Sequence, residues 1–170
     1  RICSMFGIDI RRKLYKSLLD KFGGNLTSIV VGGAALRRDV AETFTEFGVN
    51  MFQGYGLTEC APLVASNYPR GNRLGSVGKP ISCMTAKIED GEILVKGDCV
   101  MLGYYKNPEA TAEVFDKDGF FHTGDYGKLD EEGWIYITGR KKNLIILSNG
   151  KNVYPEEIEA DLQKVEGVSE

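Results

Sequence analysis

The sequence predicts a mixed α/β protein, α+β overall, built in three parts. Residues 1–80 are expected to form the end of a parallel-sheet subdomain, because a buried strand, a glycine loop, a helix and a second strand follow one another there. Residues 81–139 carry two hairpin patterns and predict a small antiparallel, β-barrel-like subdomain. Residues 140–170 begin a further α+β domain, with a short apolar strand and a helix opened by proline.

The first part begins with an amphipathic helix that Gly23-Gly24 ends. Steps of four residues predict its inward face, made of Leu14, Leu18 and Phe22. A short buried strand is expected over 27–31 and a second helix over 37–47. One face of that second helix is apolar: Val40, Phe44 and Phe47. A strand over 49–52 then leads into the stretch GYGLTECAP, residues 54–62.

The second part is expected to contain two hairpins and one short helix. Asp90-Gly91 is a strong turn signal between strands over 85–89 and 92–96. Asn107 is a suitable N-cap for a helix that starts at Pro108 and ends near residue 115. The second hairpin is predicted over 124–130 and 134–138.

The third part is expected to hold a strand over 143–147, a polar turn over 148–152 and a helix from Pro155. Ile158, Leu162 and Val165 form its predicted inward face. The predicted elements at both ends of the chain look incomplete, so we expect a piece of a larger protein. Cutting a sheet exposes strand edges and apolar faces, which predicts self-association or marginal stability of this piece.

Composition narrows the classes of function. The chain is 42% hydrophobic and 26% charged, with a net charge of −3, and it has no basic face that favours nucleic acid. No apolar run is long enough to span a bilayer. The four cysteines are scattered and the one histidine is His122, which argues against a zinc site and favours a reducing, cytoplasmic location. Peripheral attachment of the full-length protein to a membrane stays open.

Two stretches near the predicted sheet edge could carry chemistry. Gly32-Gly33-Ala34 could let the backbone approach a ligand or could be a tight turn, and the two readings are evenly matched. Tyr55 could offer a flat face to a base, while Thr58 and Glu59 could bind a phosphate and Mg²⁺. The local chemistry alone favours a simpler reading, in which Thr58 caps a helix and Glu59 suits the helix dipole.

Two charged residues further along have similar alternatives. Asp125, in His122-Thr123-Gly124-Asp125, could take the hydroxyls of a ribose, although an acid at such a bend more often caps a turn. Arg140 lies at the junction between the second and third parts. It could hold a nucleotide between two domains or make an ordinary surface ion pair.

Taken together, these stretches form a sequence pattern that is typical of one protein family. GYGLTECAP followed by FFHTGDYGKLDEEGWIYITGRKKNLIILSNGKNVYPEEIE resembles the acyl-adenylate-forming, AMP-binding superfamily of acyl-CoA synthetases, adenylation domains and luciferases. The resemblance runs from Ile29 to the end of the chain, and GDCVMLGYYKNPEATAEVFDKDGFFHTGD looks most like the long-chain fatty acyl-CoA synthetases. It implies a ligase that uses ATP, Mg²⁺ and coenzyme A. A fatty carboxylate becomes acyl-AMP with release of pyrophosphate, and the thiol of CoA then displaces AMP.

The resemblance also implies roles for individual residues. Around the nucleotide it places the backbone and aromatic lining (Gly32, Gly33, Ala34, Tyr55, Gly56), the α-phosphate hydroxyl (Thr58), the Mg²⁺ ligand (Glu59), and the ribose acid and arginine (Asp125, Arg140). It places Lys142 at the hinge of a mobile C-terminal lid domain over 140–170. Ser148, Asn149 and Gly150 match a loop that would line the pantetheine tunnel.

Two family features lie outside this sequence: an upstream phosphate loop and a C-terminal catalytic lysine. We therefore expect the chain alone to be inactive. The alternatives are an adenylation domain or aryl-CoA ligase of the same superfamily, and a non-catalytic nucleotide-binding module. A structural α/β domain without a ligand would require four stretches to match by accident.

Overall fold

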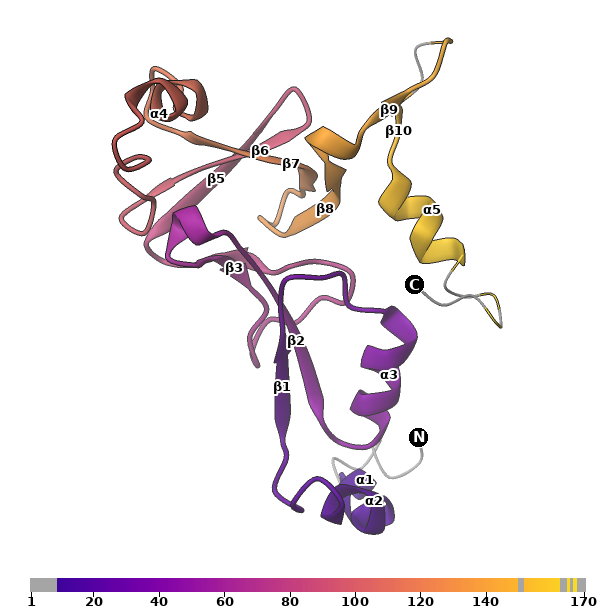
Figure 1. Cartoon of the computed structure of the whole chain (residues 1–170). Coiled ribbons are helices and arrows are strands. Elements are labelled where there is room, and N and C mark those ends of the chain that lie inside the picture. The colour runs from indigo at the N-terminus through magenta and orange to yellow at the C-terminus, as the bar shows by residue number, and fades with distance from the viewer. Residues whose placement is uncertain (1–8, 150–151, 163–164, 166, 168–170) are drawn as a thin grey trace.

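The computed structural model describes residues 9–149, 152–162, 165 and 167. Within this part of the chain, two four-stranded sheets lie next to each other and a two-stranded ribbon follows them (Figure 1). The strand orders are β1-β2-β3-β4, β5-β6-β7-β8 and β10-β9. The α/β class, with a parallel element first and an antiparallel sheet second, is confirmed.

The N-terminal helix is broken into α1 (Arg11–Leu14) and α2 (Lys16–Asp20). The predicted inward face is wrong at Leu14 and Phe22, which are 69% and 53% exposed, while Leu18 is half-buried and its neighbour Leu19 is fully buried. Residues spaced four apart share one face only if the helix is continuous. The break at Tyr15 rotates α2 relative to α1, so the spacing no longer predicts a common face. Gly23 and Gly24 end the element in the left-handed region, as expected.

The predicted strand–helix–strand unit is confirmed as β1 (Ser28–Val31), α3 (Arg38–Glu46) and β2 (Asn50–Gly56). β1 and β2 are parallel, with Val31 opposite Gln53. β2 runs further than predicted, so residues 54–56 belong to the strand. β3 (Leu63–Ser66) and β4 (Lys79–Pro80) extend the sheet in antiparallel fashion.

The second sheet contains both predicted hairpins. β5 (Met84–Glu89) and β6 (Glu92–Gly97) are joined through Asp90 and Gly91, both with positive φ, and β7 (Phe121–Leu129) pairs with β8 (Ile135–Arg140). The cap of α4 (Pro108–Val114) is confirmed, because the Asn107 side chain accepts from the Ala110 N–H at 3.1 Å.

The barrel-like expectation for the second sheet is wrong: the sheet is open, with β5 and β8 at its two edges. The β8 edge bonds instead to the segment that leads into β4, the last strand of the first sheet. Ile135 N–H donates to the Gly78 carbonyl at 2.9 Å, and Val77 N–H donates to the Ile135 carbonyl at 2.9 Å. The edge that closure would need is therefore already used.

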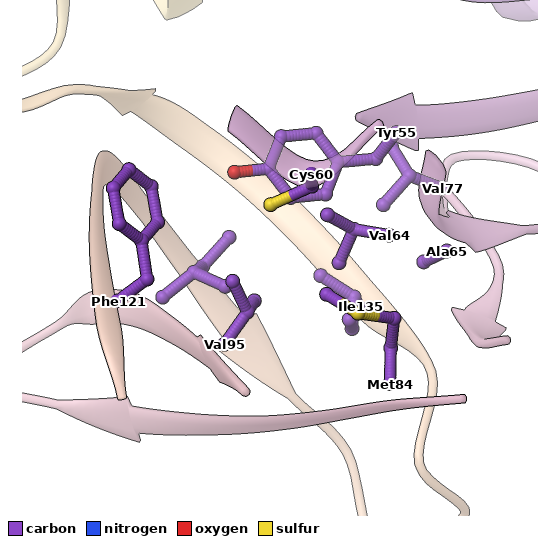
Figure 2. Packing of buried hydrophobic residues seen from close by; sticks show 10 residues of the cluster. Tyr55, Cys60, Val64, Ala65, Val77, Met84, Val95, Phe121 and Ile135 are labelled. Carbon is purple, nitrogen blue, oxygen red and sulfur yellow. The ribbon is translucent and has the colours of Figure 1, made fainter. Parts of the chain in front are cut away.

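One hydrophobic core lies between the two sheets (Figure 2). The first sheet and its connections contribute Tyr55, Cys60, Val64, Ala65 and Val77, and the second contributes Met84, Ile93, Val95, Phe121 and Ile135. Arg73 adds two ion pairs, to Asp130 at 2.7 Å and to Glu132 at 2.8 Å. The two sheets thus hold each other in a fixed relation.

The last part consists of the 3₁₀ turn η3 (Lys141–Asn143), β9 (Ile145–Ile146), β10 (Asn152–Val153) and α5 (Pro155–Leu162). The predicted inward face of its helix is wrong, since Ile158, Leu162 and Val165 are 50%, 50% and 56% exposed. An amphipathic helix buries its stripe only where a second apolar surface lies against it. No helix among the described residues is long and apolar enough to cross a membrane.

Candidate functional site

Three residues far apart in the sequence meet where the first sheet joins the second. Tyr55 lies on β2, Asp125 on β7 and Arg140 at the end of β8. The Tyr55 hydroxyl donates to Asp125 Oδ2 at 2.7 Å, and Arg140 Nε lies 3.3 Å from Asp125 Oδ1. Asp125 and Arg140 are also direct cross-strand partners. The sequence singled out all three, and the structure brings them into contact.

Tyr55 reaches this position because β2 continues through residues 54–56 into the core. The side chain is 6% exposed, so little of its ring face is open to a base. Burial, together with the Asp125 carboxylate, raises the pKa of Tyr55, so the hydroxyl stays protonated as a donor. In this arrangement the hydroxyl orients Asp125, and a contact with adenine stays a prediction.

The Asp125 carboxylate is held in place by its neighbours, but they do not use all of its hydrogen-bond acceptor positions. It is 4% exposed, and its N–H donates to Thr123 Oγ1 at 3.1 Å. An ionised carboxylate has about four acceptor positions, of which Tyr55 and Arg140 use two. The Arg140 side chain is 67% exposed and can reach a ligand beside it. This donor and acceptor set fits the vicinal hydroxyls of a ribose.

Thr58 and Glu59 lie on the 3₁₀ turn η2 (Thr58–Cys60) between β2 and β3. The expectation that Thr58 caps a helix is wrong: Leu57 is the N-cap residue, and no side-chain cap bond forms. The turn is too short because β3 returns at once, and Leu57 N–H donates to the Pro62 carbonyl at 2.7 Å. Thr58 is exposed, so its hydroxyl can reach a ligand.

Glu59 is held by two residues that the sequence did not single out as site residues. The Tyr104 hydroxyl donates to Glu59 Oε1 at 3.1 Å, and Met101 N–H donates to the Glu59 carbonyl at 2.7 Å. Partial burial and the Glu59 carboxylate raise the pKa of Tyr104. An aromatic pair in GYYK, 45 residues away, offered no signal for this contact.

The Glu59 carboxylate fits a magnesium ion shared with phosphate. Mg²⁺ is commonly held by one or two carboxylates together with substrate phosphates and waters, and one Glu59 oxygen is left by the Tyr104 bond. No group of three or more metal-binding side chains lies together in the described part of the chain. A single carboxylate such as that of Glu59 fits an ion that is bound together with a nucleotide.

The glycine stretch lies at the carboxyl-terminal end of the parallel pair, which points towards the second sheet (Figure 1). Gly33 has φ +81, and a Cβ on Gly32 would meet the Gly54 carbonyl at 3.7 Å. Gln53 Nε2 donates to the Ala34 carbonyl at 3.5 Å. At Gly56 a Cβ would collide with the Pro62 carbonyl, so glycine lets β2 and β3 approach each other closely.

The residues assigned to the lid follow Arg140 in the chain. Lys142 is exposed within η3, directly after Arg140 and Lys141. Ser148 and Asn149 are exposed in the turn after β9, and Gly150 lies outside the described residues. Their roles stay predictions.

A second residue that the sequence did not single out is Glu92, at the start of β6. Its side chain is 6% exposed and accepts from Gly124 N–H at 2.9 Å and from Lys141 Nζ at 2.8 Å, with His122 Nδ1 at 3.3 Å. Burial by itself would raise the pKa of Glu92, but these partners outweigh it and lower the pKa. An acid directly after a turn is usually solvated, so local sequence carries no signal for a buried one.

Known proteins are similar to this chain along most of its length. Residues 8–105 match the AMP-binding enzyme family. The chain is 41% identical over 153 residues to long-chain-fatty-acid–CoA ligase FadD15 of Mycobacterium bovis, covering 89% of this chain and 25% of that protein. It is 44% identical to a long-chain-fatty-acid–CoA ligase of Escherichia coli, covering 82% of this chain and 27% of that one. The chain therefore spans about a quarter of the length of these relatives.

Solved structures give the same fold. O-succinylbenzoate coenzyme A synthetase (MenE) from Bacillus subtilis, in complex with AMP, superposes with a TM-score of 0.78 at 34% identity. The match covers 91% of this chain and 36% of that one. Apo MatB from Rhodopseudomonas palustris gives 0.72 at 35% identity, covering 94% and 35%.

Proposed function

Because the chain belongs to the AMP-binding enzyme family, we propose that the whole protein is an ATP-dependent, AMP-forming acid–thiol ligase. It activates a carboxylate as acyl-AMP and transfers the acyl group to coenzyme A. The observation that carries this proposal is the contact of Tyr55, Asp125 and Arg140, three residues predicted for one nucleotide site.

The nucleotide is held by the residues that the two sheets position. Asp125 accepts hydrogen bonds from the ribose hydroxyls, and Arg140 donates to the ribose beside it. Tyr55 keeps the Asp125 carboxylate oriented through the 2.7 Å bond. Residues 32–34 and Gly56 bring the backbone close to the nucleotide and the acyl group.

The phosphate end is served by the turn after β2. The Thr58 hydroxyl donates to the α-phosphate, and Glu59, steadied by Tyr104, holds the metal. Magnesium, when bound, neutralises charge so that the carboxylate can approach the anionic phosphate. The carboxylate oxygen forms a bond to the α-phosphorus as the bond to pyrophosphate breaks. The CoA sulfur then bonds to the acyl carbon, and AMP leaves.

The segment after Arg140 supplies the second half-reaction. We assign the hinge of the lid to Lys142 and the pantetheine-lining loop to Ser148, Asn149 and Gly150. A hinge at the boundary between β8 and η3 is typical of domain rotations. This assignment keeps the division into 1–80, 81–139 and 140–170, although the first two share a core. We place the protein in the cytoplasm, with peripheral membrane attachment as a further option.

A long-chain fatty acid is the proposed substrate, because the two curated relatives described above are named for that activity at 41% and 44% identity. The second candidate is an aromatic acid, because the chain is 34% identical to an O-succinylbenzoate coenzyme A synthetase. An amino acid activated for a carrier protein is the third.

A carboxylate panel tests the proposal with the whole protein. Fatty, aromatic and amino acids are compared for ATP–pyrophosphate exchange, with CoA as acceptor for thioester formation. Long-chain fatty acids should support both reactions. Exchange with an aromatic or amino acid alone would overturn the substrate class, and no exchange with any acid would favour a non-catalytic nucleotide-binding module. The isolated 170-residue chain should show no exchange above background.

A further inference from the structure

The buried Glu92 carboxylate lies between the two residues that flank the proposed ribose pair. Gly124, whose N–H donates to Glu92 Oε1, directly precedes Asp125. Lys141, whose ammonium group donates to Glu92 Oε2, directly follows Arg140. Asp125 and Arg140 face each other across β7 and β8, so one carboxylate from β6 contacts the residue next to each member of that pair, at one end of it.

The backbone around Glu92 is arranged for these contacts. Gly124 has φ +73, a conformation that aims its N–H at the carboxylate and that a side chain would disfavour. β6 and β7 change register between Glu92 and Leu94, next to this point. A bulge of this kind re-aims side chains beside functional sites.

The energetics favour a geometric role over a stabilising one. A carboxylate that is 6% exposed loses most of its hydration, and its attraction to a half-exposed lysine does little more than offset that loss. The ion pair and its neighbouring hydrogen bonds instead fix the relative positions of the groups around Glu92. The three partners of the carboxylate come from η3, from the Gly124 backbone and from the His122 ring. The pKa of Glu92 is lowered accordingly, so the group is ionised at neutral pH.

We infer that Glu92 is a positioning residue that sets the separation of Asp125 and Arg140 and anchors the β8–η3 junction through Lys141. This inference rests on the proposed function, because it takes the ribose of an adenine nucleotide as the ligand. Glu92 itself does not touch the nucleotide.

Two substitutions separate the parts of this contact. In Glu92→Gln the amide oxygen can still accept from Gly124 N–H, but the charge is lost and with it the ion pair to Lys141. Lys141→Met removes the same ion pair and leaves the carboxylate with Gly124 and His122. Lys141→Arg keeps a cation within reach. Glu89→Gln is the matched control, because Glu89 forms an exposed ion pair with Lys87 on the same hairpin.

The measurement is the Kd of AMP by isothermal titration calorimetry on the whole protein, with the KM for ATP and for the carboxylate beside it. Glu92→Gln should raise the Kd of AMP about tenfold and raise the KM for ATP, with the KM for the carboxylate unchanged. Lys141→Met should have a similar effect, the double variant should lose less than the sum, and Lys141→Arg should restore binding. Glu89→Gln should match the wild type.

A wild-type Kd in folded Glu92→Gln and Lys141→Met overturns the inference, as does a fall in kcat alone with unchanged KM values. Lys141→Met changes an exposed residue, so it keeps the test decisive if Glu92→Gln fails to fold. If the wild type binds AMP and the variants bind equally well, only this inference fails. If the wild type binds no AMP, the proposed function fails with it.

Discussion

The junction of the two sheets and the segment after Arg140 are held by different kinds of contact. At the junction, apolar side chains from both sheets form one core, and the Tyr55–Asp125 bond is buried within it. After Arg140, the described contacts include the Lys141–Glu92 ion pair and the packing of the Tyr154 ring on Tyr126, with 5.8 Å between ring centroids. Its apolar residues remain largely open, with Ile146 67% exposed.

This difference in packing suits the two roles proposed for these regions, nucleotide binding at the junction and domain rotation after Arg140. A nucleotide site needs side chains that packing has fixed before the ligand arrives. A segment that rotates needs an attachment that a few contacts can release and remake. The boundary between the two regimes falls at η3, where the proposed hinge Lys142 lies.

The largest expected effect is on folding. Ile135→Ala should lower the free energy of unfolding of this chain by about 2–5 kcal/mol, because the side chain is fully buried between the sheets. Ile146→Ala should change it by less than about 0.5 kcal/mol. Urea unfolding followed by circular dichroism measures both. Equal losses would show that the two regions are equally packed.

The buried hydroxyl at the junction should matter next. Tyr55→Phe removes the donor to Asp125 and should destabilise by about 1.5–3 kcal/mol, the range for a hydrogen bond to a charged group. Tyr105→Phe is the control, since Tyr105 is 88% exposed. If thermal melts of the two variants coincide, Asp125 does not depend on Tyr55.

Acid should weaken the link between the two regions. The pKa of Glu92 is lowered from its ordinary value of 4.5 on folding, so its contribution to stability is present above that value and is lost as the pH falls through the lower, folded pKa. Unfolding free energies measured from pH 7 down to pH 3 should fall less steeply in Glu92→Gln. The lowered pKa values of Asp116 and Asp130 leave a residual slope in both proteins. Superimposable curves would contradict this role.

The smallest effect on stability is expected at the boundary. Arg140→Gln should change the free energy of unfolding by less than about 1 kcal/mol, because the side chain is 67% exposed and surface ion pairs contribute little. AMP should nevertheless bind several-fold more weakly, as calorimetry would show. A large loss of stability without a loss of AMP affinity would make Arg140 a structural residue.

The sequence predicted elements whose cause is local. The Asp90-Gly91 turn and the Asn107 cap depend on neighbouring residues alone, and both are confirmed. The family pattern also selected Tyr55, Asp125 and Arg140, which the structure joins.

Predictions that depended on a partner surface were wrong. The inward faces assigned to Leu14 and to Leu162 are open, because what buries a stripe is a second surface that the stripe does not encode. Glu92, Tyr104 and the approach of the Cys83 and Cys99 sulfurs to 3.2 Å all come from contacts across 16 or more residues. Local patterns carry no signal for such contacts.

The most direct test concerns the ribose. Calorimetry on the whole protein should show that AMP binds about 10–100-fold more tightly than 2′,3′-dideoxy-AMP, because the role proposed for the Asp125 carboxylate, which Tyr55 holds in place, is to accept from the two hydroxyls. Asp125→Asn should lose most of that discrimination, while Asp118→Asn, on an exposed turn, should keep it. Equal discrimination in the wild type and in Asp125→Asn would contradict the account.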